Sequence, residues 1–454
     1  MIIVSQFPLS YLWKTMRVKF TWCLLVIFGV VVIIWSLKRD IIIEKEFCGD
    51  LRNRVVGARL IKDGISPYFY KWKRGMTIRY YDPGNFNNTK PSCITASPFF
   101  LRMIIPLVEL PQASISRIWL GIEYLILLSM VTLSFFLAKT VLQKQGVIFL
   151  TLVFLLTNAW KMHVADGQNY ICIPFFALLF FYFVRKGKYI GYAWAAGAAA
   201  TCLVLIKIYA VFFLVPFLFL IRSYSRPWLL AFFTPCLVAL LWIFSSSRER
   251  GLWLDYKEQV TEFVAIFQGK GEAFVENDGP RPNLSKWEGI DLVAAAEVER
   301  NGPKRYYSEN GNFYVPCLYI FHRFVPASLL YFASIVTIGS LLLIFYRLNR
   351  SSDGPDISQV AIFGFCLYML ADLFSPIIRN QYYATQWIFP LLIAAVTFDS
   401  RRRLPYLMIL VGLLLSCIHL PFIKMGFTMG EYLILVALLV LSIFPGSKPK
   451  PLSE

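Results

Sequence analysis

Charged residues are scarce in this chain of 454 residues, since Asp, Glu, Lys and Arg make up only 16% of it, against roughly 25% in an ordinary soluble domain. Hydrophobic residues make up 57%. That excludes a soluble enzyme, because one or two water-facing domains could not bury so much apolar surface. It also excludes a disordered chain. The apolar runs are long and unbroken rather than alternating, which excludes an outer-membrane barrel. A polytopic helical membrane protein remains.

Several motifs with well-known chemistry are absent. The nine cysteines include no C-x-x-C pair and no Cys/His cluster, which argues against a metal site. There is no GxxxxGK[ST] or GxGxxG phosphate loop and no GxSxG serine motif, which argues against an ATP-driven pump and a serine hydrolase. We therefore expect no metal and no cofactor. Three cysteines lie in or beside predicted loops, but the sequence indicates no disulfide pairing for them: Cys48, Cys93 and Cys317.

The hydrophobic runs predict twelve membrane spans. The first, Phe20 to Leu37, follows a basic leader and has no small-x-small cleavage site after it, so we interpret it as a retained span with a cytoplasmic N-terminus. Three runs are shorter than the roughly 20 residues that a straight crossing needs, and are predicted to tilt or to enter only part of the membrane: 146–160, 208–221 and 386–398. The other predicted spans are residues 117–138, 169–184, 190–206, 228–245, 327–346, 358–375, 406–423 and 431–444.

Charge supports this topology. The segments assigned to the cytoplasm carry 17 basic residues and four acidic ones, as the positive-inside rule requires of short loops. Both termini are therefore predicted to be cytoplasmic, and two long loops, 38–116 and 246–326, to be extracytoplasmic. The net charge of +18 then reflects topology rather than a nucleic-acid partner. We expect residues 1–454 to form one all-α membrane domain. The oligomeric state is left open.

Asp50 stands at the start of a segment, residues 51–62, whose apolar and basic residues have helical spacing. This pattern predicts an amphipathic helix on the outer leaflet, with Asp50 at its N-terminal end, where the helix dipole favours a carboxylate. One interpretation makes Asp50 only a helix cap. The other makes it a general base at the membrane interface, flanked by cations such as Arg52 that suit a phosphate.

Four more polar stretches are candidates for a site. Residues 95–111, which include Arg102, contain three prolines and fit either an interfacial turn or the entry to a wet cavity. Gln168 and Asn169 fit either a tight turn or contacts to sugar hydroxyls. Lys207 lies between apolar residues, where a cation either reaches the surface or contacts a ligand phosphate.

The fourth stretch, residues 379–387, mixes Arg379 with amides and with Tyr382, Tyr383 and Trp387. It fits either a sugar-phosphate site or an ordinary interfacial aromatic belt. His322 precedes a span and could titrate near neutral pH. Within the predicted spans, Glu123 and Asp372 are expected to face the interior of the bundle.

The order of these pieces resembles glycosyltransferase family 87 of the GT-C superfamily. The resemblance runs through Asp50, Gly64-Ile65-Ser66-Pro67-Tyr68, Ser97-Pro98, Gly167-Gln168-Asn169 and Lys207. The chain departs from the family pattern at Arg54, where an aromatic residue is common, and at Ser97-Pro98, where Pro-Pro is common. Both departures fit a changed sugar or acceptor.

The resemblance implies an inverting glycosyltransferase on the extracytoplasmic side of a bacterial inner membrane. Such an enzyme would move mannose or a related hexose or pentose from a polyprenyl phosphate to a hydroxyl of a lipid or glycan acceptor, with Asp50 as the general base. Its phosphate contacts would be Lys207, Arg379, Arg52 and Arg102. Its sugar and acceptor contacts would be Gln168, Asn169, Tyr382, Tyr383, Trp387 and His322. Two alternatives stay open: a flippase or transporter of lipid-linked sugars, and a non-catalytic partner in envelope assembly.

Overall fold

A computed structural model describes residues 9–46, 49–70, 72, 76–81, 94–187, 189–267, 312–313, 325–350, 355–376, 379–399, 401–417 and 425–444. These residues form helices and turns, with no strand among them. The helices from the N-terminus to the centre of the chain are α1 (Leu9–Glu46), α2 (Gly49–Lys62), η1 (Ile78–Tyr80), α3 (Pro98–Met103), η3 (Ile105–Leu107), α4 (Gln112–Leu137), α5 (Val141–Leu156), α6 (Asn158–Asp166), α7 (Cys172–Lys186) and α8 (Ile190–Ile206). The remaining ones are η4 (Ile208–Ala210), α9 (Val211–Leu214), η5 (Val215–Ser223), α10 (Arg226–Ser245), α11 (Ser247–Phe267), α15 (Ala327–Asn349), α16 (Ile357–Leu373), η6 (Gln381–Trp387), α17 (Ile388–Val396), α18 (Arg403–Cys417) and α19 (Gly426–Ile443).

Among the described helices, five are long and apolar enough to cross a membrane: α4, α10, α15, α19 and the Val18–Glu44 part of α1. Helices α5 and α6 pass the same test together but are bent by 60°, so they form a broken or re-entrant span. The chain is therefore a polytopic helical membrane protein, as its apolar runs predict. The count of twelve spans and the orientation in the membrane stay predictions.

Helix α1 does not end at Leu37, where the first span was predicted to stop, but continues to Glu46. The reason is that Asp40 has partners inside the protein. Its carboxylate is fully buried and accepts hydrogen bonds of 2.8 Å from Tyr124 Oη and from Trp160 Nε1. A buried carboxylate with such partners does not force the chain out into water. Residues 41–43 therefore belong to α1.

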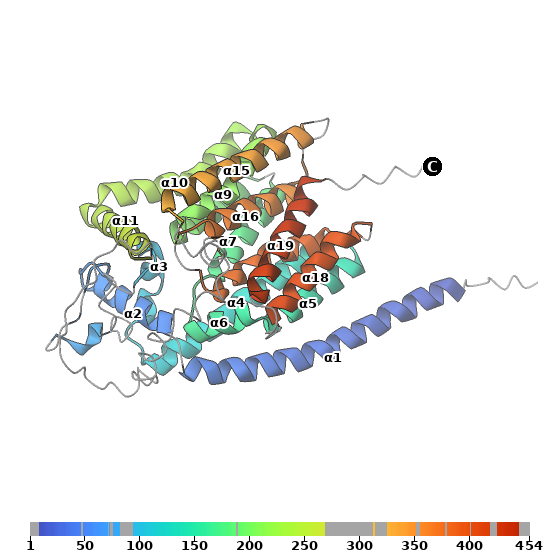
Figure 1. Cartoon of the computed structure of the whole chain (residues 1–454), viewed down its shortest axis with the longest axis horizontal. Coiled ribbons are helices and arrows are strands. Elements are labelled where there is room, and N and C mark those ends of the chain that lie inside the picture. Colours follow the sequence, from blue (N-terminus) through green and yellow to red (C-terminus); the bar gives the residue numbers. More distant parts are fainter. Residues whose placement is uncertain are drawn as a thin grey trace, which may run out of the picture.

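The helices pack as a bundle with α1 along one flank (Figure 1), where it contacts α4, α5 and α6. Helices α16 and α17 form the centre, since every residue of α17 is buried. Small residues let backbones approach closely there. A Cβ added at Gly364 in α16 would lie 2.3 Å from the carbonyl oxygen of Phe213 in α9.

Helices α2, α3 and α11 gather at one end of the bundle, and α1 begins on the side away from them (Figure 1). Helix α2 confirms the helix predicted after Asp50, but it does not lie on a leaflet surface. Residues 51–61 of α2 are buried except for Arg59, because η1, α3, η3 and α6 pack around the helix. This end of the bundle carries the candidate site.

Candidate active site

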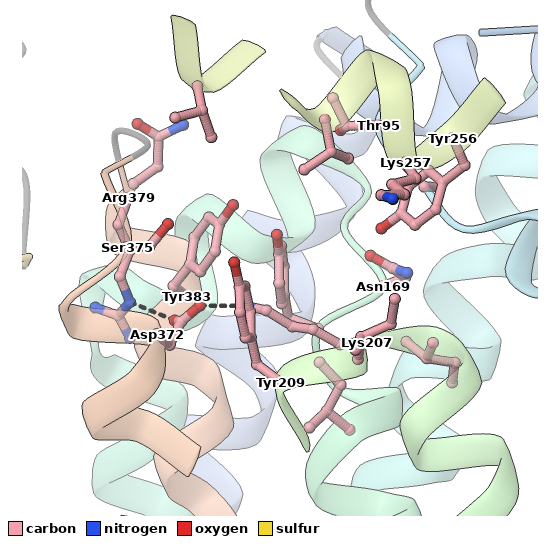
Figure 2. Close-up of a pocket in the computed structure, with 18 of the residues that line it drawn as sticks. Thr95, Asn169, Lys207, Tyr209, Tyr256, Lys257, Asp372, Ser375, Arg379 and Tyr383 are labelled. Carbon is pink, nitrogen blue, oxygen red and sulfur yellow. Dashed lines mark hydrogen bonds and ion pairs between the residues drawn. The ribbon is translucent and has the colours of Figure 1, made fainter. Parts of the chain in front are cut away.

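A cavity of about 770 Å³ lies at this end of the bundle. Its walls come from α11, from the turn between α6 and α7, from the end of α8 and from the segment around η6 (Figure 2). The volume is within the range of pockets that hold small organic ligands. Its polar and aromatic lining residues include Arg54, Thr95, Asn169, Tyr170, Lys207, Tyr209, Trp253, Tyr256, Lys257, Tyr331, Asp372, Ser375, Arg379, Asn380, Tyr382 and Tyr383.

Asp50 lies in the first turn of α2, and a side-chain relay holds its carboxylate. Gln168 Nε2 donates a hydrogen bond to Asp50 Oδ2, while Arg54 donates to Gln168 Oε1 and, at 2.9 Å, to the carbonyl oxygen of Gly167. A guanidinium group can only donate. The carbonyl oxygen of Gln168 must therefore face Arg54, and its amino group must face the carboxylate.

The carboxylate of Asp50 stays accessible. Its side chain is 38% exposed, and Arg54 Nη2 lies 3.8 Å from Oδ2. Asp50 is not itself a lining residue, but Arg54, one turn further along α2, lines the cavity, as does Asn169, next to Gln168. Asp50 thus lies beside residues that line the cavity, and its carboxylate is partly exposed, as that of a base that must meet an incoming hydroxyl needs to be.

Gly167 explains how α2 reaches the turn after α6. It ends α6 with φ +59°, a left-handed conformation that favours glycine. A Cβ at this position would also lie 2.5 Å from Leu51 Cβ. Only glycine lets α2 pack directly on this turn, and that contact brings Gln168 to Asp50.

Lys207 and Arg379 belong to a buried chain of alternating charges. Lys207 Nζ pairs with Asp372 Oδ1, and Arg379 Nε lies 2.7 Å from Asp372 Oδ2. Arg379 Nη1 in turn lies 2.6 Å from Glu431 Oε2. Asp372 therefore faces the interior, as predicted, and so does the buried Glu123. Two cations share two carboxylates here, so a ligand would find little unbalanced charge at these residues.

Three tyrosines form a platform beside this chain of charges. The ring centroids of Tyr170 and Tyr383 are 4.2 Å apart, and those of Tyr170 and Tyr382 are 5.6 Å apart. Lys207 Nζ lies 4.7 Å from the Tyr383 centroid and 5.1 Å from the Tyr170 centroid. Burial, and second the charge of Asp50, raise the pKa of Tyr382 well above its usual value. Its phenol therefore stays neutral near Asp50, and aromatic faces of this kind suit a sugar ring.

Four predicted contact residues do not line the cavity: Gln168, described above, and Arg102, Trp387 and Arg52. Arg102 pairs with Glu249 of α11, with Nε 3.1 Å from Glu249 Oε2. Trp387 is buried and donates a hydrogen bond of 2.7 Å to Glu431 Oε1. Arg52 is buried in α2. In this structure these last three side chains lie in protein contacts or are buried in the protein, and their contacts to phosphate and sugar stay predictions. His322 lies outside the described residues, as do Cys48, Cys93 and Cys317.

Helix α11 is the part of the site that the sequence analysis missed. Its lining residues recur with helical spacing: Trp253, Tyr256, Lys257, Val260, Thr261 and Val264. That periodicity is visible in the sequence and could have identified the face. The helix is held over the cavity by Arg102, by Arg248, which donates to the carbonyl oxygen of Ile61 at 2.5 Å, and by Ser66, which donates to Asp255 at 2.5 Å.

The sequence model of glycosyltransferase family 87 matches residues 95–283, somewhat less than half of the chain. The matched part contains the Gln168 turn, Lys207 and α11. No curated protein and no solved structure matches the chain. Over residues 95–283 the chain is thus similar to glycosyltransferase family 87, and its apolar helices are those of a membrane protein.

Proposed function

We propose that this protein is an inverting glycosyltransferase that uses a polyprenyl-phosphate sugar on the extracytoplasmic side of a bacterial inner membrane. The observation that carries the proposal is the carboxylate of Asp50. It is fixed by Gln168 beside residues that line a cavity with aromatic walls. The sugar is mannose or a related hexose or pentose, and the acceptor is a hydroxyl of a lipid or glycan.

In the proposed reaction, Asp50 accepts the proton of the acceptor hydroxyl while that oxygen attacks the anomeric carbon of the donor. A new C–O glycosidic bond forms as the bond between the anomeric carbon and the phosphate oxygen breaks. Attack from the opposite face inverts the configuration. The polyprenyl phosphate leaves as a monoester and takes both electrons of the broken bond. The side chains of Asn169, Tyr382 and Tyr383 hold the sugar in the cavity.

A lipid-borne donor fits the position of the cavity. Two of its lining residues, Ile208 in η4 and Tyr331 in α15, are 56% and 38% exposed. Helix α15 is one of the helices able to span a membrane. The cavity is therefore bordered by a helix that can cross a membrane, which supports a donor whose polyprenyl tail stays in the bilayer while its head group enters the site.

The test is sugar transfer by the Asp50→Asn variant. We expect the full-length protein, reconstituted in vesicles with radiolabelled polyprenyl-phosphate mannose and membrane glycolipids, to form a new glycosidic bond. The variant should lose about 10²- to 10⁴-fold in rate, as expected for loss of a general base. Glu258→Gln removes an exposed carboxylate on α11 and is the matched control.

Three other results would contradict the proposed function. Near-normal transfer by Asp50→Asn would exclude Asp50 as the base. Movement of the labelled lipid across the bilayer without bond formation would favour a flippase. If the envelope glycan of cells that carry Asp50→Asn were unchanged, a non-catalytic role would be favoured.

A further inference from the structure

The charges around the cavity are unevenly balanced. Five charged residues line it: Arg54, Lys207, Lys257, Asp372 and Arg379. As described above, Lys207 and Arg379 are matched by Asp372 and Glu431. Arg54 lies near the carboxylate of Asp50 and donates to Gln168. Each of these cations already has protein acceptors.

Lys257 is different. It lies on the cavity face of α11, and its side chain is exposed. Within the described part of the chain, Lys257 forms no ion pair. Figure 2 shows Lys257 and Tyr256 reaching from α11 on the side of the cavity opposite Asp372 and Arg379. The unbalanced positive charge of the cavity is therefore located on α11.

We propose that Lys257 binds the phosphate of the lipid-linked donor, an inference that rests on the proposed function and assigns its phosphate site. The apolar neighbours of Lys257 on the same helix face, among them Val260 and Val264, give the first isoprene units a surface to pack on. The sugar then extends over the tyrosine platform towards Asp50. Lys207 and Arg379 keep the wall of this platform rigid and do not carry the main phosphate contact.

The chemistry of the leaving group requires such a cation. The donor phosphodiester carries one negative charge, and the departing monoester carries more. The attraction between a protein cation and this phosphate is therefore stronger in the transition state than in the ground state, which accelerates the reaction. A lysine ammonium without a carboxylate partner among the described residues can meet this charge without first breaking an ion pair there.

Binding of two lipid probes to the full-length protein tests the assignment. The probes are a short-chain polyprenyl phosphate and the corresponding polyprenol, which lacks only the phosphate, and inorganic phosphate serves as competitor. We expect Lys257→Gln to weaken binding of the polyprenyl phosphate by about 10- to 100-fold, the loss typical of a charge-assisted hydrogen bond. Binding of the polyprenol should not change. Lys257→Arg should retain most of the phosphate binding.

The control is Arg250→Gln, which removes an exposed cation from the same helix outside the cavity lining. Unchanged polyprenyl-phosphate binding by Lys257→Gln would overturn the assignment, and so would equal losses for both lipids. Binding of inorganic phosphate without binding of the lipid would mean that the site takes a free anion rather than a lipid head group, which also overturns the assignment. Sugar transfer by the unmodified protein is measured separately. Transfer combined with unchanged binding by Lys257→Gln would reject only the Lys257 assignment, whereas absence of transfer would reject the proposed function.

Discussion

Gln168 donates a hydrogen bond to Asp50 although the two residues are 118 positions apart in the chain. The contact joins the first turn of α2 to the turn between α6 and α7. Arg54 fixes the direction of the Gln168 amide, because it occupies the carbonyl oxygen. The carboxylate of Asp50 therefore accepts a hydrogen bond from an amide of fixed orientation. Changes to these hydrogen bonds should affect both activity and stability.

Replacing Gln168 by Leu should lower the rate of sugar transfer by about tenfold or more, because Asp50 loses its positioning donor. The change also leaves Arg54 without one of its acceptors in a buried position, which should cost about 1–3 kcal/mol of stability. Steady-state transfer and thermal unfolding of the purified protein measure the two effects. A Gln168→Leu protein with full activity would show that the orientation of Asp50 does not depend on this amide.

Replacing Gly167 by Ala should destabilise the protein by roughly 1–3 kcal/mol, because alanine is strained at φ +59° and its Cβ would clash with Leu51. Transfer should fall as well, since Gln168 would shift away from Asp50. Gly121→Ala in α4 is the matched control, because a Cβ there meets nothing within 4 Å. Equal unfolding temperatures for the two variants would contradict the packing described for α2.

Replacing Asp372 by Asn should destabilise the protein by about 3–5 kcal/mol, because the partly buried Lys207 then loses its carboxylate partner and the buried Arg379 keeps only Glu431. The double variant Lys207→Met/Asp372→Leu removes a cation together with its partner, and should be less destabilised than the two single changes added together. Thermal unfolding of the wild type, Lys207→Met, Asp372→Leu and the double variant in one detergent gives this comparison. Additive losses would mean that Lys207 and Asp372 do not interact.

Outside the bundle, Glu109 should make stability depend on pH in the acid range. Arg79 and second Lys62 lower the pKa of Glu109 from 4.5 to about 2. Because the folded value is the lower one, the stabilisation is complete above pH 4.5 and is lost as pH falls towards 2. The difference in unfolding temperature between wild type and Glu109→Gln should therefore shrink over that interval, and high salt should shrink it at neutral pH. A difference that is the same at pH 6 and pH 3 would contradict this prediction.

Much of the helical architecture could be predicted from apolar runs. The predicted span 190–206 coincides with α8, and residues 228–245 fall within α10. The end of α1 could not be predicted in this way. In the sequence, the charge of Asp40 predicts that the chain leaves the membrane there. Only the structure shows that Tyr124 and Trp160 donate hydrogen bonds to it. The environment of α2 was misjudged for a similar reason, since the elements that cover it are distant in sequence.

The candidate site was predictable only as separate pieces. The sequence predicts candidate roles from position: Asp50 begins a helix, Lys207 lies between apolar residues, and Arg379 lies in a stretch of amides and aromatics. Gln168 and Asn169 form a polar turn. Their individual roles were harder to predict, because a charge in isolation does not reveal its partner. Lys257 was overlooked because a lysine on an amphipathic helix looks like any solvated one.

By itself, the sequence determined that this protein is a helical membrane protein, because the length and polarity of each apolar run decide locally whether a segment prefers lipid or water. It also determined which polar residues are costly enough to need an explanation. Only the tertiary structure decided which charges neutralise one another. Lys207, Asp372, Arg379 and Glu431 come from distant segments, and electrostatic energy depends on their distances in space rather than on their order in the chain.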